Sequence, residues 1–144
     1  MTFVKAGIAQ YQKVGASGAS YADPYHLTGM LMSTALDRIA QARGAIKRAD
    51  APAKGERIGK ALAIVDALRT SLDHKTGGEL ADNLAGLYEY MQHRLLAANL
   101  NSDAGALDEV ARLLREIKDG WDAIPPEARH VQKKPANATH RAPA

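Results

Sequence analysis

Residues that could carry out catalysis are few in this chain and do not form a known catalytic pattern. Asp23 and His26 have acid–histidine spacing, but Pro24 stands between them at an expected helix start, and Glu89 lies four residues before His93. A di-iron site in a helical bundle needs Glu-x-x-His from two helices, and none of the expected helices contains one. No phosphate-binding loop occurs, and Ser, His and Asp do not share a local motif. We therefore expect a protein that is not an enzyme, without catalytic residues, cofactor or metal site.

Length and composition limit the class of protein further. The chain has 144 residues, is 46% hydrophobic and contains no cysteine, which predicts one domain with a single core and no disulfide or thiolate site. Its longest apolar runs are a few residues, whereas about 20 are needed to cross a bilayer. The N-terminus lacks the continuous apolar segment of a secretory signal. We expect a cytoplasmic protein that does not insert into a membrane.

The net charge of +3 comes from the end of the chain. Residues 1–124 contain equal numbers of basic and acidic side chains, so the excess lies in residues 125–144. Phosphate binding needs a basic face on a folded surface or a dense basic arm. Four cations spread over this tail form neither, so no nucleic-acid partner is expected.

Four stretches have apolar residues at steps of three and four, which is typical of amphipathic helices. The expected helices span about 24–49, 56–74, 79–99 and 103–124. Asp23 and Pro24 provide a helix start, and Pro125 with Pro126 ends the last helix. Short polar connections predict an all-α fold, an antiparallel up-down four-helix bundle over residues 23–124. Residues 1–22 are expected to form a short cap and flexible link, and residues 125–144 a disordered basic tail.

The third expected helix has more apolar surface than one contact face requires. Leu80, Leu84, Leu87 and Met91 follow a stripe that should face the core, while other large side chains, Tyr88, Tyr90 and Leu96, fall beside or opposite it. Ile64 and Leu113 lie off the main stripes of their helices, whereas Trp121 lies on the regular seam of the last helix and is expected in the core. The additional apolar side chains either pack against neighbouring helices or bind a partner.

Several segments together resemble the FliS family of flagellar export chaperones. They are AQYQKV from residue 9, LTGMLMSTAL after the Asp-Pro helix start, LRTSLD from residue 68, GGELADNLAGLYEYMQHRLLAANLNSD from residue 77, and LDEVARLLREIKDGW from residue 107. The resemblance covers about residues 8–124, and the combination of LYEYM, RLLAAN and the late LDEV with Trp is specific.

The resemblance implies a cytosolic chaperone that binds the C-terminal segment of flagellin, prevents premature polymerisation and helps to deliver it to the flagellar type III export machinery, including its export-gate protein. It also implies that Ile8 and Tyr11 belong to a cap that covers the bundle and takes part in binding. We expect a monomer or a weak homodimer. The candidate partner-binding residues are Ile8, Tyr11, Ile64, Leu68, Leu87, Tyr90, Leu96 and Leu113.

An alternative remains open at this point. The same additional apolar side chains could serve a helical adaptor that binds another export or regulatory protein. A flagellin without its C-terminal segment discriminates between the two, because a chaperone specific for that segment should not bind it.

Overall fold

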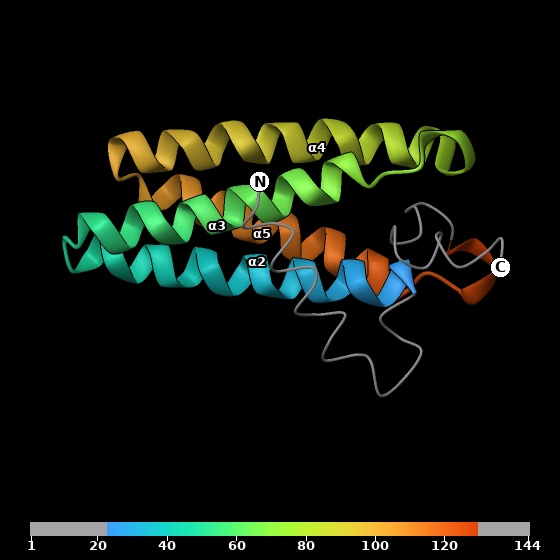
Figure 1. Ribbon diagram of the computed structural model, residues 1–144, viewed down its shortest axis with the longest axis horizontal. Coiled ribbons are helices and arrows are strands. Elements are labelled where there is room, and N and C mark those ends of the chain that lie inside the picture. Colours follow the sequence, from blue (N-terminus) through green and yellow to red (C-terminus); the bar gives the residue numbers. More distant parts are fainter. Residues whose placement is uncertain (1–22, 130–144) are drawn as a thin grey trace, which may run out of the picture.

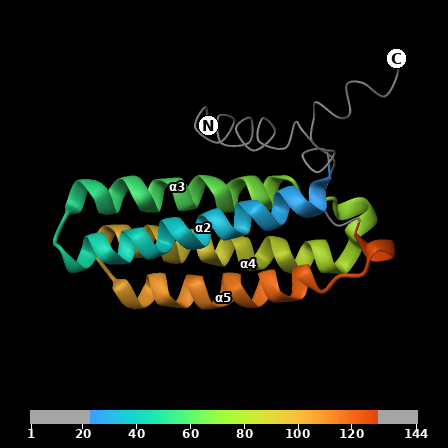
Figure 2. The ribbon, with the colours of Figure 1, turned by 90° about the horizontal axis from the view of Figure 1, so that it is seen from below.

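The computed structural model describes residues 23–129 as four long helices and one short 3-10 turn (Figure 1). The helices are α2 (Pro24–Lys47), α3 (Ala51–Thr70), α4 (His74–Asn101) and α5 (Ala104–Asp122), followed by η3 (Pro126–Ala128). Each long helix packs against two others, in the cyclic order α2, α3, α4, α5. Figure 2 shows the helices side by side along one long axis. The expected all-α, up-down four-helix bundle is confirmed.

Every long helix begins immediately after an aspartate. The side chains of Asp23, Asp50, Asp73 and Asp103 each accept a hydrogen bond from a backbone amide of the first turn, at 3.0–3.2 Å. Such a cap satisfies one of the amides that a helix start leaves without a partner, and it stabilises a helix by about 1 kcal/mol. Asp50, Asp73 and Asp103 therefore mark where the chain reverses between successive helices, and Asp23 marks the start of α2.

These caps explain why two helices begin earlier than the sequence indicated. Helix α3 begins at Ala51 rather than near residue 56, because Asp50 and Pro52 provide a cap and a first-turn proline instead of a break. Helix α4 begins at His74 rather than near residue 79, because the reversal occurs before the Asp73 cap. Gly78 is non-helical, with φ 54° and ψ −131°, and separates the first turn of α4 from its long segment.

The ends of the helices also differ from the expected bounds. Helix α2 ends at Lys47, α3 at Thr70 and α5 at Asp122, each a few residues before the predicted end, while α4 continues to Asn101. Residues 125–129, assigned to the tail from the sequence, include η3 and return to the start of α2. The rest of the expected tail, and the whole expected cap and link over residues 1–22, lie outside the described residues.

The core runs through the centre of the bundle. Its largest fully buried side chains are Met32, Ile39, Ile58, Val65, Leu68, Leu72, Tyr88, Met91, Leu95, Leu107, Val110 and Leu114. Tyr88 is completely buried, and its hydroxyl has no hydrogen-bond partner within the described part of the chain. Burial raises the pKa of this phenol above its ordinary value. Trp121 is 4% exposed, which confirms its expected place in the core.

Candidate partner-binding surface

Helix α4 carries most of the large apolar side chains that the described bundle leaves exposed. The exposed residues of this kind are Met30, Leu80, Leu87, Tyr90, Leu96 and Leu100, and all except Met30 lie on α4. Large apolar side chains exposed as a group on one element are typical of interaction surfaces. Helix α4 is therefore the strongest candidate for a partner-binding surface.

The exposed side chains of α4 divide between its two flanks. At about 100° per residue, Leu80, Leu87 and Tyr90 fall on one side of the buried face, and Leu96 falls on the other. Hydrogen bonds identify the neighbours: Tyr90 Oη bonds Glu109 of α5, whereas Gln92 Nε2 bonds Asp66 of α3. Leu80, Leu87 and Tyr90 thus border α5, and Leu96 borders α3.

Helix α5 adds apolar side chains to the same border. Leu113 and Ile117 follow Glu109 at intervals of four residues, so the three side chains share the face of α5 that contacts α4. Both are half-buried and pack against the core. We call this set, Leu80, Leu87, Tyr90, Leu113 and Ile117, the α4–α5 apolar stripe. It follows the seam between the two helices.

A polar cluster closes one end of the stripe. Glu109 accepts hydrogen bonds of 2.6 Å from both Tyr90 Oη and Arg94 Nε. These two bonds hold the pKa of Glu109 below its usual range, and the bond from Tyr90 has the larger effect. The same bond raises the pKa of Tyr90. Arg94 is thereby paired with a carboxylate, as expected for a long cation on a helix. The hydroxyl of Tyr90 is fixed, while 43% of the residue remains exposed.

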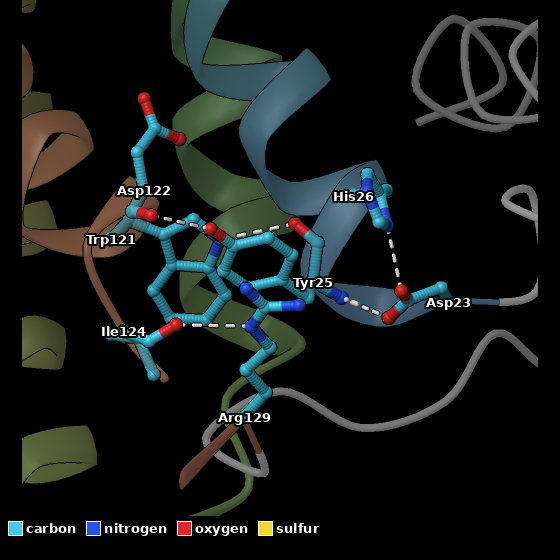
Figure 3. Close-up of polar contacts among 7 residues, drawn as sticks. All are labelled: Asp23, Tyr25, His26, Trp121, Asp122, Ile124 and Arg129. Carbon is cyan, nitrogen blue, oxygen red and sulfur yellow. Dashed lines mark hydrogen bonds and ion pairs between the residues drawn. The ribbon is translucent and has the colours of Figure 1, made fainter. Parts of the chain in front are cut away.

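An aromatic cluster lies at the end of the bundle where α2 begins and α5 ends (Figure 3). The rings of Tyr25 and Trp121 are stacked with centroids 5.6 Å apart, and the guanidinium carbon of Arg129 lies 3.9 Å from the centroid of Tyr25. Tyr25 Oη donates to the carbonyl of Asp122 at 2.9 Å, and Trp121 Nε1 donates to the carbonyl of Tyr25 at 3.0 Å. This cluster joins α2 to α5. The sequence reasoning did not assign Tyr25 or Arg129 to it.

The structure places the candidate contact residues that it describes in three different environments. Leu87, Tyr90 and Leu96 are exposed on α4, while Ile64 and Leu113 are half-buried against the core. Leu68 is completely buried, so it has no surface to offer a partner in this structure. Ile8 and Tyr11 lie outside the described residues. Leu87, Tyr90 and Leu113 come together on one seam, whereas Leu96 and Ile64 do not belong to it.

The buried face of α4 is rotated slightly from the predicted one. Leu80 and Leu87, placed on the core stripe from their spacing, are 47% and 38% exposed, and their neighbours Ala81 and Tyr88 are fully buried instead. The rotation places the large Tyr88 ring in the core. Leu80 was therefore missed as a candidate contact, although it lies seven residues before Leu87 on the same flank.

The ionisable side chains pair without forming a metal centre. Within residues 23–129 no group of three His, Asp or Glu side chains could hold a metal ion. The acid–histidine contacts are two-residue pairs, His26 Nδ1 with Asp23 at 2.6 Å (Figure 3) and His74 Nδ1 with Asp82 at 2.7 Å. None of the described helices is long and apolar enough to cross a membrane.

Comparison with known proteins gives a consistent result. The profile of the family described as flagellar protein FliS matches residues 7–128. A flagellar secretion chaperone FliSB of Pseudomonas aeruginosa is 49% identical over 123 residues, covering 85% of this chain and 98% of the relative. The flagellar secretion chaperones FliS of Vibrio cholerae and Salmonella typhimurium are each 41% identical, over 86% and 88% of this chain and 92% and 95% of the relatives.

Proposed function

Because the chain belongs to the FliS family, we propose that it binds the C-terminal helical segment of flagellin in the cytoplasm and assists its delivery to the flagellar type III export apparatus. Bound flagellin would be unable to polymerise prematurely, and the export-gate protein would receive the complex. A role as a chaperone in flagellar export follows from the family, and several relatives are named as flagellar secretion chaperones over nearly their whole length. A chaperone family is not a class of enzymes, and we assign this chain no catalytic role.

The observation that carries the flagellin proposal is the α4–α5 apolar stripe. Leu80, Leu87 and Tyr90 are each more than a third exposed, and they recur at intervals of seven and three residues along one flank of α4 after Gly78. An amphipathic partner helix with apolar residues at the same intervals would cover them in the helix-in-groove mode of recognition. Leu113 and Ile117 would form the floor of that contact.

The energetics suit a chaperone that must release its partner. A segment that folds on binding spends roughly 2–5 kcal/mol of the interaction energy on its own ordering. The stripe offers a few large apolar side chains rather than a continuous exposed core, so its contribution to affinity is bounded. We propose a complex that is stable enough to cover flagellin and weak enough to transfer it at the export gate.

The contact residues follow from their exposure. We propose Leu87 and Tyr90, with Leu80, as the centre of the flagellin contact, Leu113 at its edge, and Leu96 on a separate contact toward α3. Ile64 lies seven residues after Arg57 on the flank of α3 that borders α2, so we propose it as a contact apart from both. Leu68 remains in the core. Ile8 and Tyr11 keep the role that the family resemblance implies, as part of a movable cap.

The central experiment measures flagellin binding by calorimetry with the full chain and a double variant, Leu87→Ser with Tyr90→Ser. We expect affinity to fall by one to two orders of magnitude, because two adjacent apolar contacts of about 1–3 kcal/mol together would be lost. Leu100→Ser is the matched control, since Leu100 is 82% exposed and lies off the stripe. Equal affinity of the double variant and the control would contradict the assignment of this surface.

A second measurement tests the partner. Flagellin without its C-terminal helical segment should not bind the full chain. If the truncated flagellin bound as tightly as the intact one, the alternative of an adaptor for another export or regulatory protein would replace the chaperone proposal.

The cap proposal has its own test, a chain lacking residues 1–18. A movable cap predicts altered flagellin affinity in a bundle of unchanged thermal stability. If stability fell together with affinity, Ile8 and Tyr11 would instead complete the core. Light scattering of the intact chain would test the expected monomer or weak homodimer.

A further inference from the structure

The segment around the α2–α3 connection is strongly basic. Residues 38–60 contain seven basic side chains and two acidic ones, while the remainder of residues 23–129 contains seven basic and fourteen acidic ones. The seven are Arg38, Arg43, Lys47, Arg48, Lys54, Arg57 and Lys60. A local excess of positive charge on a bundle that is otherwise negatively charged attracts negatively charged partners.

Helix stability does not account for this concentration of charge. Cations at the end of α2 complement its dipole, but Lys54 lies in the first turn of α3 and Arg57 in the second, near the end where the dipole favours acids. The first turn of α3 has no acidic residue. Arg57 contacts its neighbour Glu56 at 3.4 Å, and Arg48 has no carboxylate partner within the described part of the chain.

Two of these arginines border one pocket between α2 and α3. The pocket has a volume of about 390 Å³ and is lined by Ala40, Gln41, Gly44, Arg48, Ala53 and Arg57. Ala40, Gly44 and Ala53 give the pocket its space, and the long side chains of Gln41, Arg48 and Arg57 complete its wall. A Cβ on Gly44 would lie 3.2 Å from Arg48 Nη1, which shows that the guanidinium of Arg48 lies close over the glycine.

We propose that this pocket, the α2–α3 basic pocket, binds an acidic segment of a partner protein, with a carboxylate between Arg48 and Arg57. Guanidinium groups match carboxylates in geometry and can bind them through two parallel hydrogen bonds. The pocket lies on the seam opposite the α4–α5 apolar stripe in the cyclic order of helices, so the inference does not rest on the flagellin proposal.

Other anionic partners fit the pocket less well. Residues 38–60 contain no aromatic side chain on which the bases of a single-stranded nucleic acid could stack. None of the exposed large apolar residues of the described chain lies in this range, whereas surface helices that bind membranes combine cations with such residues. An acidic protein segment needs neither.

The test is a nuclear magnetic resonance titration of the full chain with a short helical peptide that carries glutamates one turn apart. We expect the amide signals of Gly44 and Ala53 to shift, and the same peptide with glutamine in place of glutamate to leave them unchanged. The double variant Arg48→Gln with Arg57→Gln should weaken binding of the acidic peptide by about tenfold or more.

Arg112→Gln with Arg115→Gln is the matched control, because it removes the same charge from exposed positions of α5. It should leave peptide affinity unchanged, and the pocket variant should bind flagellin as the unaltered chain does. The proposal fails if both double variants weaken peptide binding equally, or if Gly44 and Ala53 do not respond. It also fails if duplex DNA or anionic phospholipid vesicles bind this site more tightly than the acidic peptide.

Discussion

Tyrosine side chains serve different purposes in the aromatic cluster at the bundle end and in the α4–α5 apolar stripe. At the end of the bundle, Tyr25 and Trp121 stack on each other and each donates a hydrogen bond to a backbone carbonyl. On the α4–α5 apolar stripe, Tyr90 also has a hydrogen-bonded hydroxyl, but its ring and the adjacent Leu87 remain 43% and 38% exposed.

The difference lies in the apolar faces rather than in the polar groups. In the aromatic cluster and in the stripe alike, the hydroxyl and indole groups donate hydrogen bonds, so these bonds do not distinguish the two places. At the bundle end the chain covers its own rings, since Arg129 lies over Tyr25 (Figure 3). On the stripe the described chain covers Leu87 and Tyr90 only in part. The aromatic cluster joins α2 to α5 within the fold, whereas the stripe is suited to contact a helix of another protein.

The largest expected effect concerns the bundle end. Trp121→Ala should lower the free energy of unfolding by about 3–5 kcal/mol, because it leaves a large cavity and removes a hydrogen bond to α2. Urea denaturation followed by circular dichroism measures this. Tyr90→Ala is the comparison, with an expected loss of at most about 1 kcal/mol for an exposed side chain. Similar losses of stability in the two variants would contradict the view that Trp121 stabilises the fold while Tyr90 serves partner binding.

A second prediction compares the two flanks of α4. Leu87→Ser should weaken flagellin binding by about tenfold, or 1.4 kcal/mol, whereas Leu96→Ser should have a smaller effect. The reason is that Leu87 shares its seam with Tyr90 and Leu113, and Leu96 lies across the helix. Calorimetry on the two single variants decides it. A larger effect at Leu96 would move the main contact to the α3 side.

A third prediction uses the buried hydroxyl of Tyr88. Tyr88→Phe should raise the free energy of unfolding by about 1 kcal/mol, because it removes a buried hydroxyl without a partner in the described chain and keeps the ring. Thermal unfolding of the variant beside the unaltered chain measures the change. A destabilised variant would show that the hydroxyl has a partner that the described residues do not provide.

The smallest expected effect is the pH dependence of the pairs on α5. Hydrogen bonds from Tyr90 and Arg94 hold the pKa of Glu109 below its usual value, and the bond from Arg43 does the same for Asp108. Their stabilising contribution is therefore present above the ordinary carboxyl pKa of about 4 and is lost as pH falls through the lowered folded-state values.

Glu109→Gln tests this contribution. The variant should lose less thermal stability than the unaltered chain between about pH 7 and pH 3, because the titrating pair is absent. Glu116→Gln, an exposed carboxyl on the same helix, is the control. An unchanged pH profile in the Glu109 variant would show that the pair does not contribute.

The sequence predicted the fold because its helices are strongly periodic, and it predicted their ends less well. Asp50 is followed by Pro52, and Asp73 by Gly77 and Gly78, residues that commonly break helices, yet both aspartates act as caps. The difference cannot be read locally, because it depends on where the preceding helix stops. The face of α4 that is buried also differs by about one residue from the predicted one. Spacing alone favours leucine over Ala81 for the core, whereas Ala81 and Tyr88 are the residues that are buried.

The candidate surface could be predicted only in part, for a related reason. Tyr90 and Leu96 are additional apolar residues by their spacing, while Leu87 is a candidate contact that the spacing places on the core stripe. Which of them meet on one seam depends on Glu109 of α5. Leu68 looked equivalent to them, yet the neighbouring helices bury it completely. The bundle-end contacts join residues 96 and 97 positions apart, and no local spacing encodes such a pair.

The position of Trp121 has a practical consequence. It is the single tryptophan of the chain, and it stacks on Tyr25 at the junction of α2 and α5. Its emission therefore reports on that junction without any added dye. Separation of the two helix ends would expose the indole to water and shift its fluorescence to longer wavelength, while an intact junction would leave the spectrum unaltered during partner exchange elsewhere on the bundle.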